Sequence, residues 1–167
     1  MLGQFWSDAV STEKMPLPGT LYTSPLARCL ETTRLVFKKT FEEQQAQFRP
    51  VIKESLRELL TDHTCDRRST RSWIENNYPD YVLEPGFSEE DILWTGGRWE
   101  TREEHTLRKQ AVLEDIFSTD ENNFISLTVH SYAISAILRV LGLPEFRVRE
   151  GSSIALFVKA DKIGYDN

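Results

Sequence analysis

The stretch that decides the fold is Phe124-Ile125-Ser126-Leu127-Thr128-Val129-His130-Ser131. Its apolar and β-branched residues predict a buried strand over residues 124–129. The strand ends at His130, and Ser131 is placed to cap a helix predicted over residues 132–141, which Gly142 and Pro144 close. A strand that leads directly into a helix is the repeating unit of α/β proteins.

A second unit of this kind lies near the start of the chain. Residues 21–24 predict a short strand, and Pro25 suits the first position of a helix. The apolar positions that follow recur every three or four residues, at Leu26, Leu30, Thr33, Phe37 and Phe41. This spacing predicts one buried helix face. Residues 1–19 resemble the tail of an element that begins elsewhere.

The middle of the chain adds further elements. Residues 50–54 predict a second strand, and residues 61–71 form a polar, arginine-rich stretch. A short helix is expected around Trp73 and Ile74, ending at Tyr78. Residues 80–100 are expected to form a long excursion or lid. Thr101 and Glu104 fit a capping box that opens a helix to about Phe117.

Residues 147–150 and 154–159 predict two strands or a hairpin around Gly151. Together the elements predict one α/β domain over residues 1–167, a three-layer sandwich with a largely parallel central sheet flanked by helices.

Composition narrows the class of protein. The 167 residues include 20 basic and 26 acidic side chains, a net charge of −6, which argues against a nucleic-acid-binding or membrane-surface protein. Cys29 and Cys65 are the two cysteines, too few for a disulfide framework. No apolar run approaches the ~18 residues of a membrane span. A soluble protein of the reducing cytoplasm is therefore expected.

Three polar side chains follow predicted strands, where ligands bind in open α/β sheets. Arg28 lies in the first turn of the helix after residues 21–24, His130 follows residues 124–129, and Glu58 comes just past the second strand. Arginine at a helix N-terminus suits an anion. Each residue also has an ordinary explanation: a surface ion pair of Arg28 with Glu31 or Glu54, a packed core histidine and a surface glutamate.

Taken together, three segments in this order resemble the histidine phosphatase superfamily, also called phosphoglycerate-mutase-like proteins. Residues 22–33, including Ser24-Pro25-Leu26-Ala27-Arg28, are similar to its S-P-L-x-R segment. Leu56-Arg57-Glu58 is similar to its L-R-E segment, and Thr128-Val129-His130-Ser131 to the segment with its second histidine. Thr64-Cys65-Asp66-Arg67-Arg68-Ser69 resembles the fungal phosphomutase-like branch.

The resemblance implies a phosphomonoesterase that needs no metal or other cofactor. A histidine in an N-terminal R-H-G motif would attack phosphorus and form a phosphohistidine. Arg28 and His130 would bind the phosphoryl oxygens, His130 would stabilise their developing charge, and Glu58 would protonate the leaving group. The expected ligand is a small phosphorylated metabolite or inorganic phosphate. Mutase and phosphatase activity both stay open.

This sequence departs from the family pattern at two points. It contains no R-H-G, and the other two histidines, His63 and His105, do not follow strands. The strand that bears R-H-G is expected before Met1, so the domain is expected to be N-terminally truncated and inactive by itself. Tyr132 stands where the family usually has glycine, and it is expected to crowd or close the pocket.

Several expectations compete or follow from this interpretation. A pseudoenzyme or interaction module that binds phosphate without turnover is the main alternative, and a degraded gene product without function is another.

Arg67 and Arg68 are candidates for the substrate entrance, although a solvated loop also explains them. His63 and Cys65 lack a matching pair of ligands, so no metal site is predicted. A missing central strand would leave an open sheet edge, so self-association, poor stability or completion of the sheet by another chain is expected.

Overall fold

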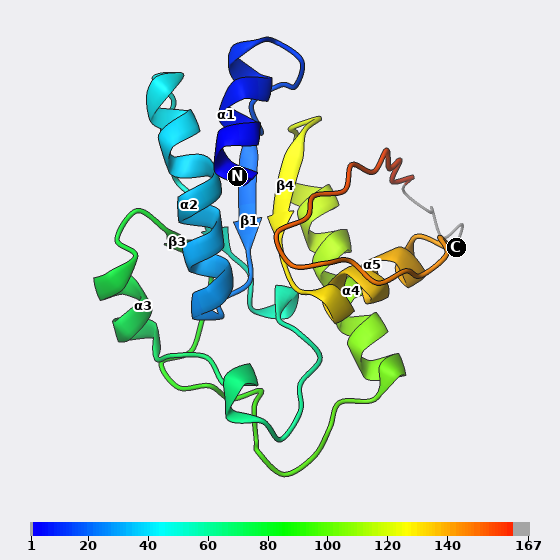
Figure 1. Cartoon of the computed structure of the whole chain (residues 1–167). Helices are drawn as coiled ribbons and strands as arrows, with labels where there is room; N and C mark the ends of the chain where they lie inside the picture. The colour runs from blue at the N-terminus through cyan, green and yellow to red at the C-terminus, as the bar shows by residue number, and fades with distance from the viewer. Residues whose placement is uncertain (1, 162–167) are drawn as a thin grey trace, which may run out of the picture.

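Four parallel strands form the central sheet of the computed structural model, which describes residues 2–161 (Figure 1). They are β1 (Thr20–Thr23), β2 (Val51–Ile52), β3 (Val82–Leu83) and β4 (Ile125–Thr128), in the order β3-β2-β1-β4. β1 lies at the centre, with Thr23 opposite Ile52 on one side and opposite Thr128 on the other. Parallel pairing brings the carboxyl ends of the four strands to one edge of the sheet.

Helices cover both faces of this sheet. α1 (Leu2–Ser11) and α2 (Ala27–Glu43) pack together on one face, and α4 (Arg102–Thr119) and α5 (Ser131–Val140) on the other (Figure 1). The remaining helical segments are the short α3 (Arg71–Asn77) and the 3₁₀ turns η1 (Glu54–Leu56) and η2 (Thr64–Asp66). The predicted α/β architecture with a parallel sheet flanked by helices is therefore confirmed.

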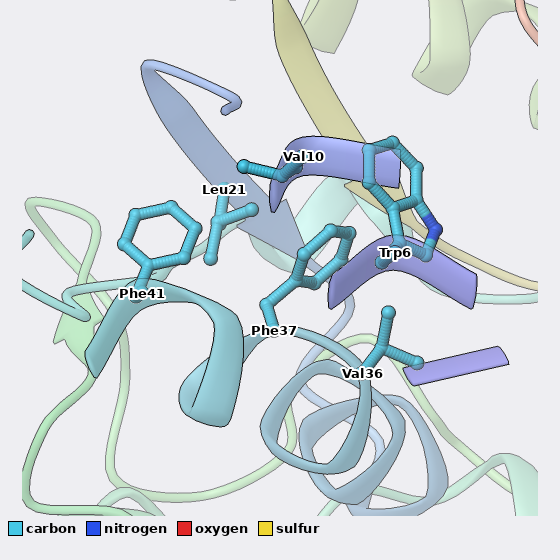
Figure 2. Packing of buried hydrophobic residues seen from close by; sticks show 6 residues of the cluster. All are labelled: Trp6, Val10, Leu21, Val36, Phe37 and Phe41. Atoms are coloured by element: carbon cyan, nitrogen blue, oxygen red, sulfur yellow. The ribbon is translucent and has the colours of Figure 1, made fainter. Parts of the chain in front are cut away.

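Two consecutive residues of β1 contribute to the core on opposite faces of the sheet. Leu21 packs among Trp6, Val36, Phe37 and other side chains of α1 and α2 (Figure 2). The next residue, Tyr22, faces the opposite way and packs against Leu56 and the α4 residues Val112 and Ile116. Side chains alternate between the faces of a strand, so a strand apolar on both sides lies inside a three-layer fold.

The structure corrects two predicted elements. Residues 80–100 are not solely an excursion, because β3 pairs in parallel with β2 there, with Val51 opposite Val82. Residues 147–150 and 154–159 form neither two strands nor a hairpin: a turn closes from Ser152 N–H to the Arg149 carbonyl, and the flanking segments are irregular. Among the described residues, those segments pair with no strand, and a strand needs such a partner to form.

β4 lies at the edge of the described sheet. Its described pairing partner is β1, and the side chains of residues 125–128 are half-buried. Within residues 2–161, no helix is both long enough and apolar enough to cross a lipid bilayer.

Candidate active site

Adjacent strands place Ser24, Arg28 and His130 together. Ser24 follows β1, Arg28 is the second residue of α2, and His130 stands between β4 and α5. The Ser24 N–H donates to the Thr128 carbonyl at 3.0 Å, which extends the β1–β4 ladder to the point where both chains turn into helices. The two strand ends therefore present their side chains to one another.

The hydrogen bonds of His130 define its tautomer. Arg28 Nε donates to His130 Nδ1 at 3.1 Å, and His130 Nε2 lies 2.8 Å from Ser24 Oγ. Because arginine can only donate, Nδ1 must accept, and a neutral ring then carries its proton on Nε2. His130 therefore donates to Ser24 and is the partner of Arg28, instead of the carboxylates of Glu31 or Glu54 considered from the sequence.

The environment of His130 favours the neutral ring. Burial, followed by the positive charge of Arg28, lowers the pKa of His130 to about 2. The Cys29 Sγ lies 3.3 Å from Nε2, and burial raises the pKa of this thiol to about 12. At neutral pH this group of side chains therefore holds one positive charge, on Arg28.

Glu58 lies at the N-terminus of α5. Its Oε1 accepts hydrogen bonds from the N–H groups of Leu59 and Ala133, both at 3.0 Å, and Oε2 lies 3.4 Å from the Tyr132 nitrogen. The predicted cap is thereby corrected: Ser131 is the first residue of α5, and Glu58 satisfies the free N–H groups. Burial raises the pKa of Glu58, although these N–H groups and Arg28 act in the opposite direction.

A cavity of about 530 Å³ joins these groups. Arg28, Cys29, Glu58 and His130 line it, together with residues 126–129 of β4 and residues 148–153. The cavity therefore runs along the outer edge of β4 and ends at the three side chains that the sequence singled out. An arginine, a histidine and a buried carboxyl around one cavity can bind a tetrahedral anion and transfer a proton to it.

The loop at residues 61–68 holds Arg28 in place, a role the sequence analysis did not assign. Arg28 Nη1 donates to the Cys65 carbonyl at 2.7 Å, and Nη2 lies 3.6 Å from Asp66 Oδ1. The Arg28 side chain remains 46% exposed, so it is accessible to an anion. Asp66 belongs to the stretch that resembles the fungal branch, but only the tertiary structure shows its contact with Arg28.

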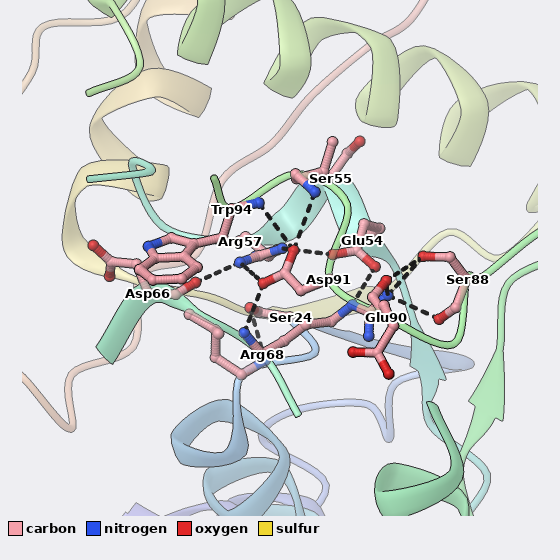
Figure 3. A network of polar contacts seen from close by, with 12 residues as sticks. Ser24, Glu54, Ser55, Arg57, Asp66, Arg68, Ser88, Glu90, Asp91 and Trp94 are labelled. Carbon is pink, nitrogen blue, oxygen red and sulfur yellow. Dashed lines mark hydrogen bonds and ion pairs between the residues drawn. The ribbon is translucent and has the colours of Figure 1, made fainter. Parts of the chain in front are cut away.

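Arg68 does not lie at an entrance. It is buried, and its guanidinium donates to Glu54 at 2.8 Å and to the carbonyls of Ser88 and Glu90 (Figure 3). Its positive charge therefore interacts with buried groups of the protein itself. Arg67 is exposed and lies over the Trp94 ring, 5.7 Å from its centre, and it does not line the cavity.

Tyr132, His63 and His105 lie outside the cavity. The Tyr132 side chain is 63% exposed and does not line the cavity, so it does not close it as expected. His63 is exposed beside Trp99, and His105 is buried within α4. Residues 2–161 contain no group of three or more His, Cys, Asp or Glu side chains arranged to hold a metal ion.

Comparisons with known proteins point to one family. A family model described as the histidine phosphatase superfamily (branch 1) matches residues 8–152. The "probable phosphoglycerate mutase" of Arthroderma benhamiae is 41% identical over 175 residues, which cover 93% of this chain and 52% of that protein. The "probable phosphoglycerate mutase PMU1" of Saccharomyces cerevisiae is 33% identical over 161 residues, covering 86% and 55%.

A further relative is the "phosphomutase-like protein 3" of Candida albicans, 28% identical over 156 residues, covering 93% of this chain and 48% of that protein. The chain thus spans about half the length of the curated relatives it matches. Among solved structures, the mycobacterial glucosyl-3-phosphoglycerate phosphatase matches with a TM-score of 0.46 and 20% identity, over 85% of this chain and 66% of that one.

Proposed function

Because this chain belongs to the histidine phosphatase superfamily (branch 1), we propose that its cavity binds the phosphoryl group of a small phosphorylated metabolite or inorganic phosphate. The observation that carries the proposal is the convergence of Arg28, Glu58 and His130 on one cavity of about 530 Å³. These residues are far apart in the sequence and come from different segments.

Arg28 would make the principal contact with the anion. Its Nη2 lies 3.6 Å from Asp66 Oδ1, which is longer than a hydrogen bond. This end of the guanidinium can therefore turn towards phosphoryl oxygens. A bound anion would also favour the protonated form of His130 and raise its pKa. Arg28 and His130 would then both donate to the ligand in place of their mutual hydrogen bond.

Glu58 is suited to be the proton donor of the reaction. Burial raises its pKa, so its carboxyl group holds a proton at higher pH than an exposed glutamate does. In the whole protein, we expect a histidine outside this sequence to attack phosphorus, and Glu58 to protonate the leaving oxygen of the phosphomonoester as its bond to phosphorus breaks. The product on the protein would be a phosphohistidine, which water then hydrolyses.

A second candidate function is phosphate binding without turnover. The positions of the other two histidines favour it for the 167-residue chain: His63 and His105 do not line the cavity. His130 would donate to the phosphoryl group from a protonated ring, which cannot act as a nucleophile, so without a further histidine at the cavity no phosphohistidine can form. We therefore expect this chain to bind phosphate and not to hydrolyse phosphomonoesters.

Isothermal titration calorimetry with inorganic phosphate tests the binding site. Arg28→Ala is expected to weaken binding at least tenfold, because a hydrogen bond to a charged group contributes about 1.5–3 kcal/mol. Arg34→Ala is the matched control, since Arg34 lies on the same helix and pairs with Glu31 at the surface. No binding by the wild type, or equal effects of the two variants, would refute the phosphate site.

An activity assay separates the two candidate functions. We expect metal-independent phosphomonoesterase activity and a trapped phosphohistidine in a protein with the full length of the relatives, and neither in the 167-residue chain. Turnover by the 167-residue chain would contradict the non-catalytic alternative. A full-length protein without turnover or phosphohistidine would contradict the enzymatic proposal.

A further inference from the structure

Two consecutive basic side chains of α4 contact the backbone that carries Glu58. Lys109 Nζ donates to the carbonyls of Ser55 and Arg57, both at 2.6 Å. Arg108 donates from Nη1 to the same carbonyls at 3.1 and 3.2 Å, and from Nη2 to the Glu58 carbonyl at 2.9 Å. These two residues therefore bind three carbonyls that the 3₁₀ turn η1 and the residues after it leave free.

Lys109 is an unusual residue for this position. It is fully buried on the face of α4 that also holds Val112, Leu113 and Ile116. Burying an ammonium group in such surroundings is unfavourable unless it is hydrogen-bonded. An apolar residue would fill this position in an ordinary amphipathic helix, so the hydrogen bonds of Lys109 to the Glu58 segment call for an explanation.

The opposite side of the same segment is also anchored. The Arg57 guanidinium binds both carboxylate oxygens of Asp91, each at 2.7 Å, and Glu54 at 2.9 Å (Figure 3). Further along, Glu100 accepts the Leu60 N–H at 3.1 Å and pairs with Arg108 at 2.6 Å. Glu58 thus projects from a backbone held on both sides, and its carboxyl group reaches the N-terminus of α5.

We propose that Lys109 is a positioning residue for Glu58: by binding the Ser55 and Arg57 carbonyls it directs the Glu58 carboxyl group into the cavity beside Arg28 and His130. This inference rests on the proposed function, because it assigns a partner to the proton donor of that site. Lys109 does not line the cavity, so it does not contact a bound anion itself.

The pH dependence of anion binding reports where Glu58 lies. An ionised Glu58 in the cavity repels an anion, and protonation removes that repulsion. Sulfate is the probe, because its own charge does not change between about pH 5 and about pH 7.5. We expect the wild type to bind sulfate about tenfold more tightly at the lower pH than at the higher.

Other charged and titratable side chains face Glu58 and Lys109, and their charges can also affect the pH dependence of anion binding. Arg28 and Cys29 come from α2, Arg57 from the η1 segment, His105 and Arg108 from α4, Glu100 precedes α4, and His130 precedes α5. Burial lowers the pKa of His105 to about 3, so it stays neutral, and lowers that of His130 to about 2 in the absence of an anion. A proton that His130 gains when an anion binds is common to all the variants, so it does not alter the comparison between them. Burial alone would raise the pKa of Glu100, but the hydrogen bond and charge of Arg108 and the Leu60 N–H together lower it, so Glu100 stays ionised.

Lys109 itself also titrates in this range. Burial, followed by the charge of Arg108, lowers its pKa to about 6. The loss of its charge as the pH rises would weaken anion binding in the same direction as the ionisation of Glu58. A single variant therefore cannot separate positioning from direct attraction, and a double-mutant cycle is needed.

The experiment measures the ratio of sulfate affinities at the two pH values by calorimetry in the wild type, Glu58→Gln, Lys109→Met and the double variant. Positioning predicts that each single variant reduces the tenfold ratio to about the same smaller value and that the double variant reduces it no further. Lys39→Met, at a side chain that is 68% exposed, is the matched control and should keep the wild-type ratio.

Other outcomes would overturn the proposal. A wild-type ratio in Lys109→Met, or effects that multiply in the double variant, would show that Lys109 does not act through Glu58. An absence of sulfate binding by the wild type would refute the proposed function as well. Lys109→Met should fold, because Arg108 still binds both carbonyls. If it does not, Lys109→Gln, which keeps N–H donors, takes its place in the cycle.

Discussion

At the scale of single residues, buried charge organises the loops around the site. Arg57 and Asp91 form a two-point ion pair inside the protein, and Arg68 donates to the Asp91 carboxylate through its backbone N–H at 2.9 Å. Burial alone would raise the pKa of Asp91, but the hydrogen bonds from Arg57 and from backbone N–H groups bring it below the ordinary value. The pair thus joins residues 57, 68 and 91, which belong to three different loop segments.

Asp91→Asn is expected to destabilise the protein by about 3–5 kcal/mol, because it leaves the buried Arg57 charge without its main partner. Urea unfolding followed by circular dichroism gives the free energy of unfolding. Asp80→Asn removes the surface partner of Lys38 and is the control, with an expected loss of at most about 1 kcal/mol. Equal losses in the two variants would show that the buried pair has no special role.

At the scale of elements, the helices that flank the site begin in different ways. α4 has a complete capping box, in which Thr101 Oγ1 accepts from the Glu104 N–H and Glu104 Oε2 accepts from the Thr101 N–H. α5 has no cap from its own N-cap residue, His130. Its first turn depends on Glu58 instead, so the helix that borders the cavity is stabilised by a residue of the site.

Thr101→Ala is expected to lower the free energy of unfolding by about 1 kcal/mol, because the first turn of α4 loses a hydrogen-bond acceptor. We expect fraying to stay confined to the first turn of α4, because the packing of Val112 and Ile116 holds the rest of the helix in place. Arg108 and Lys109 lie in that remaining part. Gln110→Ala, in the middle of α4 on its exposed face, is the control and should change stability by less than about 0.5 kcal/mol. Thermal unfolding compares the two.

At the scale of the whole molecule, the free side of β4 is the notable feature. Residues 126–129 line the cavity on this side, and within residues 2–161 no strand pairs with it. Unpaired edges present N–H and C=O groups to other chains. The irregular segment at residues 154–158 is apolar and at least partly exposed, which adds a surface that favours association.

We expect the 167-residue chain to associate with further copies of itself through this edge. Sedimentation velocity over a dilution series should show a concentration-dependent increase in mass. Ser126→Lys places a charge beside the open edge and should shift the equilibrium towards the monomer, whereas Ser118→Lys on the exposed surface of α4 should not. A monodisperse monomer at all concentrations would contradict the expectation.

The sequence by itself determined the units of the fold and the residues that follow its strands. Strands at 20–23 and 125–128 and the helices after them are specified by local apolar spacing and by residues such as Gly142, which adopts a φ of 68° just after α5. Since parallel strands share an edge, Arg28 and His130 could be expected to meet there. Their segments were therefore predictable from short-range patterns.

Only the tertiary structure decided how the charged residues are used. Arg68 and Lys109 look like surface side chains in the sequence, yet both are buried and bind carbonyls of other segments. Glu58 takes the capping role expected of Ser131, and residues 147–159 form no strands although their composition favours them. These outcomes depend on partners far away in the chain, because a hydrogen bond or a strand needs a second segment at a distance that local sequence does not encode.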